Sequence, residues 1–274
     1  MKETVHTSDI FERLRAERPL AGRRILILVE NLPLPFDRRV WHESLTLRAA
    51  GAEVAVICPT GKGFEAPYEQ IEGVHIYRHN LPIDAKGASG YLLEYSAALW
   101  HEFRLAIKIW RKGGFDTIQA CNPPDLMFLV ALPFKWFRGV KFIFDHHDIN
   151  PELYEAKFNK RGLFWKLMVL FERWTFRAAH VVISTNQSYR KIAMTRGNVA
   201  SEDVFVVRSG PNLEKLQRVD PDPKWHNGRD HMLGYVGVMG DQEGIDLLLE
   251  SMRHIVFDRG RNVQLVLVGG GPAL

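Results

Sequence analysis

The chain alternates between short apolar runs and amphipathic segments, and this alternation most constrains its fold. Continuous apolar runs, such as residues 24–29 and 140–144, are typical of parallel strands that are buried on both faces. Segments with apolar residues at helical spacing, such as residues 38–50, lie between them. The other expected strands of this region are residues 54–58, 74–77, 116–120, 181–184 and 204–207. This succession predicts an α/β fold with a Rossmann-like, doubly wound parallel sheet.

The pattern changes after residue 207 and divides the chain. Residues 1–23 are charged and predict a short helix or a frayed tail, and residues 24–207 form the first domain. Residues 208–230 are rich in turn-forming residues and predict a linker. Residues 231–274 contain one further β-α-β unit, the start of a second Rossmann-like domain. Because about 40 residues rarely close a stable core, we expect this second domain to be incomplete, as in a truncated chain.

Two long helices are expected to bury aromatic residues. In residues 91–112, helical spacing places Trp100 in an apolar stripe, and the helix over residues 163–178 is expected to bury Phe164 and Trp174. Their other faces carry basic residues: Arg104, Lys108, Arg111, Lys166, Arg173 and Arg177. Such faces are most simply solvated. However, basic helices with aromatic neighbours also attract anionic lipid headgroups, which keeps peripheral membrane contact as an alternative.

Composition restricts the class of protein. A chain of 274 residues with 46% hydrophobic and 25% charged residues is typical of a soluble globular protein, and its net charge of +4 permits anionic partners without requiring them. Cys58 and Cys121 are too few for a disulfide scaffold, which is typical of a reduced cytosolic protein. The sequence shows neither a bilayer-spanning apolar run nor the apolar core of a signal peptide. We therefore expect a cytoplasmic protein, with the inner face of the plasma membrane as an alternative location and no nucleic-acid partner.

Polar residues crowd the point where the strand at residues 140–144 ends. The sequence there is Asp145-His146-His147-Asp148-Ile149-Asn150-Pro151-Glu152. In open α/β sheets, ligands bind outside the carboxyl ends of the strands. The two ring nitrogens of His147 suit contact with a sugar hydroxyl or a phosphate oxygen, whereas the alternative is a histidine bonded to neighbouring backbone. We expect His146 to be structural, and Asp148 either to orient His147 or to cap the following helix.

Other strand ends supply further candidates. Asp37, Arg38 and Arg39 follow the first strand, where an arginine could hold a phosphate bidentately or simply be a solvated residue at a helix start. Asn122 and Asp125 follow the strand at residues 116–120, and Asp125 is also a candidate helix N-cap.

Glycines follow the strand at residues 232–238. Gly237 and Gly240 lack side chains, so they could allow the backbone to approach a phosphate or sugar, or form a tight turn. No GxGxxG follows the first strand and no GxxxxGK[ST] occurs, which disfavours a nicotinamide or flavin dehydrogenase and a P-loop nucleotidase. No group of residues has convincing metal-ligand spacing, so we expect no metal.

Several segments, in this order, carry a family resemblance. They are Asp37-Arg38-Arg39-Val40-Trp41, Asp145-His146-His147-Asp148 with Pro151-Glu152, Phe171-Glu172-Arg173, Ala178 to Asn186, Val207 to Asn212, Gly234 to Gly240 with Gln242-Glu243-Gly244, and Gly269 to Pro272. Together these segments resemble the family-four retaining glycosyltransferases of the GT-B class. The resemblance covers residues 24–272.

The resemblance implies a fold, an activity and a set of site residues. The GT-B fold has two Rossmann-like domains facing across a cleft. The implied activity is retaining transfer of a sugar from a nucleotide diphosphate sugar, UDP favoured over GDP, to a carbohydrate or lipid-linked glycan, as in polysaccharide biosynthesis. No metal or other cofactor is implied. His147 and Asp148 are implied as catalytic. The implied substrate-binding residues are Asp37, Arg38, Arg39, Asn122, Asp125 and Asn186, and the implied donor-binding residues are Gly237, Met239, Gly240 and Gln242.

The chain also departs from the family pattern. The loop at residues 31–36 lacks the family's paired glycines, and residues 239–244 lack the Arg and Lys that neutralise the donor diphosphate. The family's distal glutamate motif would lie beyond Leu274. Two alternatives therefore stay open: a nucleotide-sugar epimerase of the same architecture, and a non-catalytic carbohydrate- or membrane-binding fragment.

Overall fold

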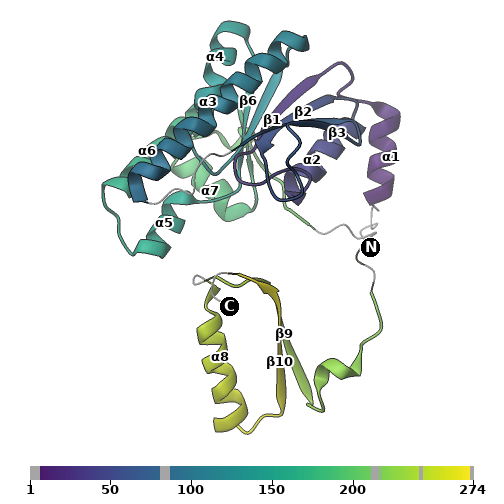
Figure 1. Cartoon of the computed structure of the whole chain (residues 1–274), viewed down its shortest axis with the longest axis vertical. Helices are drawn as coiled ribbons and strands as arrows, with labels where there is room; N and C mark the ends of the chain where they lie inside the picture. Colours follow the sequence, from purple (N-terminus) through teal and green to yellow (C-terminus); the bar gives the residue numbers. More distant parts are fainter. Residues whose placement is uncertain (1–6, 81–86, 211–215, 217, 241–242, 272–274) are drawn as a thin grey trace. The chain divides into compact units, whose positions relative to one another are not determined.

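The protein divides into two compact units in a computed structural model that describes residues 7–80, 87–210, 216, 218–240 and 243–271 (Figure 1). The first unit comprises residues 1–211 and the second comprises residues 212–274. The division falls inside the segment expected to be a linker.

An eight-stranded sheet forms the centre of the first unit (Figure 1). The strands, in spatial order, are β3 (Tyr68–Ile71), β4 (Val74–His79), β2 (Glu53–Pro59), β1 (Arg24–Leu28), β5 (Thr117–Cys121), β6 (Lys141–His146), β7 (Val181–Ser184) and β8 (Val204–Val206). Every neighbouring pair is parallel except β3 and β4, which are antiparallel. The expected α/β sheet is confirmed, and the edge strand β3, which the sequence analysis missed, makes it mixed.

Helices cover both faces of this sheet. On one face lies α2 (Arg38–Ala49), against which α1 (Thr7–Glu17) packs, and on the other lie α3 (Gly87–Gly113), α4 (Phe128–Arg138) and α6 (Leu163–Ala178). The first unit also contains α5 (Asn150–Phe158), α7 (Gln187–Thr195) and the short η1 (Ser201–Asp203). Successive side chains of a strand point to opposite faces. Accordingly, Ile25 and Ile27 of β1 pack in the core beneath α2, while Leu26 and Leu28 pack beneath α3 and α4.

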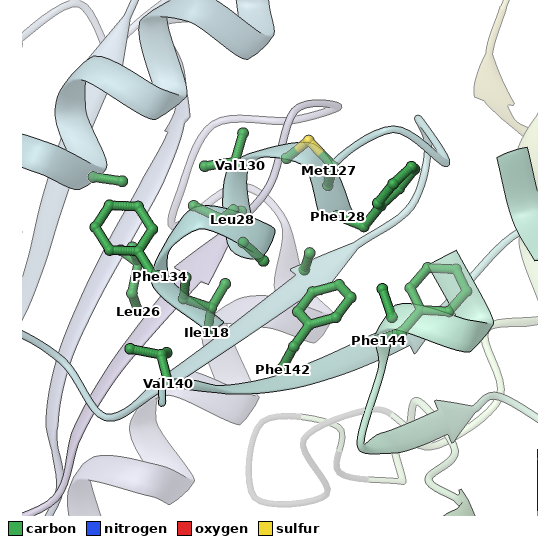
Figure 2. Packing of buried hydrophobic residues seen from close by; sticks show 14 of the residues in the cluster. Leu26, Leu28, Ile118, Met127, Phe128, Val130, Phe134, Val140, Phe142 and Phe144 are labelled. Atoms are coloured by element: carbon green, nitrogen blue, oxygen red, sulfur yellow. The ribbon is translucent and has the colours of Figure 1, made fainter. Parts of the chain in front are cut away.

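Aromatic side chains fill the larger of these two cores (Figure 2). Phe142 and Phe144 of β6 are each 1% exposed and lie near Phe134 of α4 and Phe176 of α6 within one cluster. Phe134 contacts the ring of Phe115 at a centroid distance of 5.0 Å, and Phe144 contacts Phe176 at 5.2 Å. Tilted and edge-on rings of this kind pack densely, so the sheet that carries the candidate site has a rigid support.

The expectation that Trp100, Phe164 and Trp174 lie in the core is wrong. Their side chains are 63%, 56% and 42% exposed. Among the side chains of α3 that the structure describes, the buried ones are instead Ala98, Glu102, Leu105, Ala106 and Ile109. The buried residues of α6 are Val169, Glu172, Thr175, Phe176 and Ala178. Both helices carry large apolar residues on more than one face, so helical periodicity alone could not identify the inward one.

The second unit is a β-α-β arrangement. β9 (His231–Val238) pairs in parallel with β10 (Val263–Gly270), and α8 (Ile245–Arg253), followed by the π-helical turn η4 (His254–Asp258), connects them. The short η2 (Pro223–His226) precedes β9. Among the described residues of the whole chain, no helix is both long and apolar enough to cross a membrane.

Candidate active site

Arg39 lies at the centre of a polar network at the carboxyl edge of the large sheet. Its Nη2 donates to Asp145 Oδ1 at 2.9 Å, and its Nη1 donates to Val207 O at 2.9 Å and to Ser209 Oγ at 3.1 Å. Its Nε lies 3.2 Å from Glu43 Oε1. Burial opposes the charge of Arg39, yet the two carboxyl groups hold the pKa of the guanidinium above its usual value. The bidentate face of Arg39 is therefore already occupied by protein groups.

His147 is the neighbour of Arg39 in this network. Its Nε2 lies 2.8 Å from Asp145 Oδ2 and 2.6 Å from Arg39 Nε. Burial disfavours the Asp145 carboxylate, but the contact with His147 and the charge of Arg39 lower its pKa, so Asp145 is ionised. Nε2 of His147 is thus occupied by Arg39, whose Nε–H donates to it, and by Asp145, so Nδ1 is the nitrogen left for a ligand. Asp145, rather than Asp148, is the carboxylate that orients the ring.

Glu43 and Gln119 belong to the same network, although neither was expected from the sequence. Gln119 Nε2 donates to Glu43 Oε2 at 2.8 Å and to Asp145 Oδ2 at 3.2 Å. Burial, reinforced by the charge of Asp145, raises the pKa of Glu43 to about 8. Glu43 is thus mostly protonated at neutral pH, and Arg39 and Asp145 form a charge-balanced pair. The spacing of four residues between Arg39 and Glu43 on one helix was an available signal.

Asn122 and Asp125 hold the turn that carries His147. Asn122 Oδ1 accepts from the backbone N–H groups of His147 at 2.6 Å and Asp148 at 3.1 Å, and its Nδ2 donates to Asp125 Oδ1 at 2.9 Å. Asn150 Nδ2 donates to Asp125 Oδ2 at 2.7 Å. Asn122 and Asp125 are only 3% and 6% exposed, so the structure places them behind the turn, where they position it. Burial raises the pKa of Asp125 to about 6.

Neither Asp125 nor Asp148 caps a helix. The N-caps of α4 and α5 are Met127 and Ile149, and neither makes a side-chain cap bond. Asp148 is half-buried, and burial raises the pKa of its carboxyl group. Asp148 follows His147 directly and so lies at the candidate site, but it neither orients His147 nor caps the following helix.

The structural interpretation of His146 is confirmed. Its side chain is fully buried, and its ring packs against Phe144, Phe176 and Tyr189 at centroid distances between 5.1 and 5.4 Å. His146 Nε2 lies 3.5 Å from Oε1 of the buried Glu172. The two adjacent histidines therefore point to different places, one into the core and one to the sheet edge.

Asp37 and Asn186 serve as helix caps. Asp37 Oδ1 accepts from Val40 N at 3.1 Å at the start of α2, and Asn186 Oδ1 accepts from Tyr189 N at 3.0 Å at the start of α7. Arg38 is exposed and lines a hollow of about 350 Å³. The hollow is lined by Arg38, Arg39, His42, Glu43, Thr46, Leu47, Gln119, Ile183, Val207, Arg208, Ser209 and Gly210. Of these two arginines, Arg38 is exposed, whereas the guanidinium of Arg39 is held by protein groups.

The expected donor-binding residues belong to the second unit. They are Gly237, Met239, Gly240 and Gln242, of which Gln242 lies outside the described residues. A Cβ atom at Gly269 would overlap the backbone of Gly237, so the ends of β9 and β10 approach each other closely. Met239 is 3% exposed, and its N–H donates to Gly270 O at 3.0 Å. These contacts belong to the parallel pairing of β9 with β10, and Gly237 lies within β9, so the expected tight turn is not found at Gly237.

Folding brings Cys121 to Asp145 and His147, a grouping that the sequence spacing did not reveal. One potential ligand atom from each lies within 4.8 Å of the others. However, Arg39 already contacts Asp145 and His147, and a fixed guanidinium repels a cation. Burial also raises the pKa of the Cys121 thiol well above its usual value, and a neutral thiol is a poor ligand. We therefore assign no metal to this group.

Residues 37–210 match the Glycosyl transferase 4-like domain family, and the chain belongs to this family. No curated protein sequence matches the chain. Among solved structures, a sucrose-phosphate synthase from Thermosynechococcus elongatus is similar at a TM-score of 0.68 and 16% identity, over 90% of this chain and 62% of that one. The trehalose-6-phosphate protein from E. coli, bound with UDP-2-fluoro glucose, is similar at a TM-score of 0.60 and 10% identity, over 91% and 65%.

A putative UDP-N-acetylglucosamine 2-epimerase from Listeria monocytogenes is also similar, at a TM-score of 0.56 and 12% identity, over 90% of this chain and 62% of that one. At these identities the likeness establishes the fold, which is that of the GT-B glycosyltransferases. The chain spans less than two thirds of the length of these three structures.

Proposed function

We propose that the chain is part of a retaining glycosyltransferase. It would move a sugar from a nucleotide diphosphate sugar, UDP-linked in preference to GDP-linked, to a carbohydrate or lipid-linked glycan in the cytoplasm, as in polysaccharide biosynthesis. One observation supports this proposal most: His147 is held by Asp145 and Arg39 at the carboxyl edge of the sheet, where α/β proteins bind ligands.

The contacts suggest how this edge would act on a sugar. With Nε2 bonded to Asp145, Nδ1 of His147 is available to a hydroxyl or phosphate oxygen of the donor. Asp145 and Arg39 would hold the His147 ring in place beside the leaving diphosphate, on which negative charge develops. Arg38 would contribute a mobile cation in the hollow beside it.

No metal is needed in this scheme. Arg38 and backbone N–H groups would bind the diphosphate. The acceptor hydroxyl would attack on the face from which the diphosphate leaves, and a diphosphate oxygen would accept its proton. The anomeric configuration would thereby be retained.

The test is a transfer assay with UDP- and GDP-sugars and lipid-linked glycan acceptors, comparing the wild-type chain with His147→Ala. We expect turnover to fall about a hundredfold or more, because an electrostatic contact to the reacting group is lost. His75→Ala, on β4 and bonded to Tyr68, is the matched control and should keep its turnover. Equal turnover of wild type and His147→Ala would remove His147 from the site.

The likeness to the putative epimerase favours one rival, an epimerase of the same architecture. Analysis of products without acceptor separates the two, since an epimerase would interconvert the nucleotide sugars, and a transferase would leave them unchanged apart from slow hydrolysis. A non-catalytic module would bind acceptor without UDP, which titration calorimetry would detect.

A further inference from the structure

The outer face of the helical layer formed by α3, α4 and α6 has an unusual composition. Large apolar side chains are exposed on all three helices: Trp100 on α3 at 63%, Leu129, Trp136 and Phe137 on α4 at 46%, 70% and 80%, and Leu163, Phe164, Leu170 and Trp174 on α6 at 71%, 56%, 37% and 42%. Isolated exposed apolar residues are ordinary, but a set of this size across adjacent helices marks an interaction surface.

The three helices form one layer. Phe103 of α3 contacts the ring of Phe134 of α4 at 6.2 Å, and Phe128 of α4 contacts Trp174 of α6 at 6.5 Å. All three cover the same face of the sheet (Figure 1). Residues spaced by three, four, seven or eight share one side of a helix. By this spacing, the exposed Trp100 lies on one side of α3 with Arg104 and Lys108, and the exposed Trp136 lies on one side of α4 with Leu129. The exposed Leu170 lies on one side of α6 with Leu163, Lys166 and Arg173.

The charges on this outer face have one sign. Exposed cations follow the apolar residues along the rows of α3 and α6: Arg104, Lys108, Arg111, Lys166, Arg173 and Arg177. Arg138, at the end of α4, is also exposed, and its guanidinium lies over the ring of Trp110 at 5.8 Å. In the part of these helices whose side chains the structure describes, the acidic residues are Glu102 and Glu172, and both are fully buried. None of the ion pairs between described residues involves one of these cations.

We propose that this outer face binds the surface of an anionic lipid bilayer. Aromatic and leucine side chains interleaved with unpaired Lys and Arg are the combination that buries at the boundary of headgroups and acyl chains. Each cation near an anionic surface adds an attraction that salt weakens. A second copy of the chain fits this face poorly, because two identical cationic surfaces would repel each other.

The experiment is cosedimentation of the full chain with vesicles of phosphatidylcholine alone or of equimolar phosphatidylcholine and phosphatidylglycerol. We expect binding to the anionic vesicles, loss of that binding in high salt, and little binding to the neutral ones. Lys166→Glu with Arg173→Glu should weaken binding about tenfold or more, since each cation near the surface contributes about 1 kcal/mol. Trp136→Ser with Phe137→Ser should weaken it through loss of apolar contact.

The matched control is Arg15→Glu with Arg23→Glu, which makes the same change in net charge at exposed positions outside the three helices. This variant should bind within about twofold of wild type, because net charge alone is not the cause. The proposal would be overturned if the control variant weakened binding as much as Lys166→Glu with Arg173→Glu does. It would also be overturned if the wild-type chain did not bind anionic vesicles, or bound neutral vesicles equally well. A dimer in sedimentation analysis that Trp136→Ser with Phe137→Ser dissociates would reassign the face to a second copy. Loss of oligonucleotide binding in the α6 variant, without vesicle binding, would reassign it to nucleic acid.

The vesicle assay is independent of the proposed function. Binding does not require sugar transfer, and the His147→Ala variant should bind vesicles as wild type does. The two proposals therefore fail separately.

Discussion

β1 in the first unit and β9 in the second are the same kind of element with opposite surroundings. Each is an apolar parallel strand followed by a helix, yet Ile27 of β1 is fully buried, whereas Val236 of β9 is 81% exposed. β1 pairs with β2 and β5 and has helices over both faces, while β9 pairs with β10 in the described part of the second unit. The burial of a parallel strand thus depends on its neighbours more than on its own sequence.

The helices show the same contrast. Leu247 and Leu249 of α8 are 64% and 51% exposed, although the helix is strongly amphipathic. In the first unit, α4 buries Phe128, Val130, Ala131 and Phe134. A unit of about 60 residues buries a smaller share of its apolar surface than a larger one, and is correspondingly less stable. We therefore expect the second unit to open at a much smaller free energy cost than the first.

The largest expected difference concerns apolar truncation in the two units. Phe142→Ala, in the core of the first unit, should lower its free energy of unfolding by about 3–5 kcal/mol, because a buried aromatic ring is replaced by a cavity. Leu249→Ala, on half-exposed α8, should cost about 1 kcal/mol or less. Hydrogen exchange resolved by residue measures each unit separately. If Leu249→Ala lowered the free energy of unfolding as much as Phe142→Ala does, the two units would not differ in burial as described.

A second difference depends on pH and concerns Glu43 in the first unit. Its folded-state pKa of about 8 lies above the usual value of 4.5, so the folded state binds more protons between these values. The stabilisation is complete below about pH 4.5 and is lost as pH rises toward 8. Relative to Glu43→Gln, the wild-type first unit should therefore lose stability over that window. Chemical denaturation at a series of pH values measures the difference.

The second unit serves as the internal control for this experiment. Exchange of the β9 and β10 amides should be unaffected by Glu43→Gln at every pH, after correction for the intrinsic exchange rate. If the pH dependence were the same in both proteins, Glu43 would not be the group responsible.

The smallest expected effects come from a matched pair of glycines. Gly139 ends α4 with φ 67° and Gly244 begins α8 with φ 65°, a region that favours glycine. Replacing either by alanine should cost about 1 kcal/mol. Gly139→Ala should accelerate exchange in the first unit, and Gly244→Ala in α8, β9 and β10 alone. Faster exchange in β1 caused by Gly244→Ala would show that the units open together.

Much of the fold could be predicted because apolar runs and helical spacing are local signals. The strands at residues 24–29 and 181–184 agree with β1 and β7 to within a residue, and α6 covers the expected residues 163–178. The edge strand β3 was missed because Tyr68–Ile71 includes two polar residues and has only one strand partner. A helix after Asp148 was expected without bounds, and α7 was missed. Both α5 and α7 have only nine residues, which is too short for a clear helical pattern of apolar residues.

The candidate site could be predicted only in part. His147 at a strand end is visible in the sequence, since the carboxyl edge of a parallel sheet is a general ligand site. Arg39, which donates to His147, lies on α2, and Arg39 is in turn held by the backbone carbonyl of residue 207 beyond β8. Asn122 and Asp125 looked like ligand contacts, but their burial behind the turn could not be predicted from spacing.

By itself, the sequence determined the alternating α/β architecture, the break after the first domain, the family and the strand-end position of His147. These depend on local patterns of side-chain polarity, which fold the same way in many contexts. The tertiary structure alone decided that protein groups hold Arg39 and leave Arg38 exposed, and that Asp145 is the carboxylate that orients His147. It also decided that Trp100, Phe164 and Trp174 of α3 and α6 face outward beside cations. Those outcomes depend on contacts between residues far apart in the chain, and on which of several apolar helix faces the sheet buries.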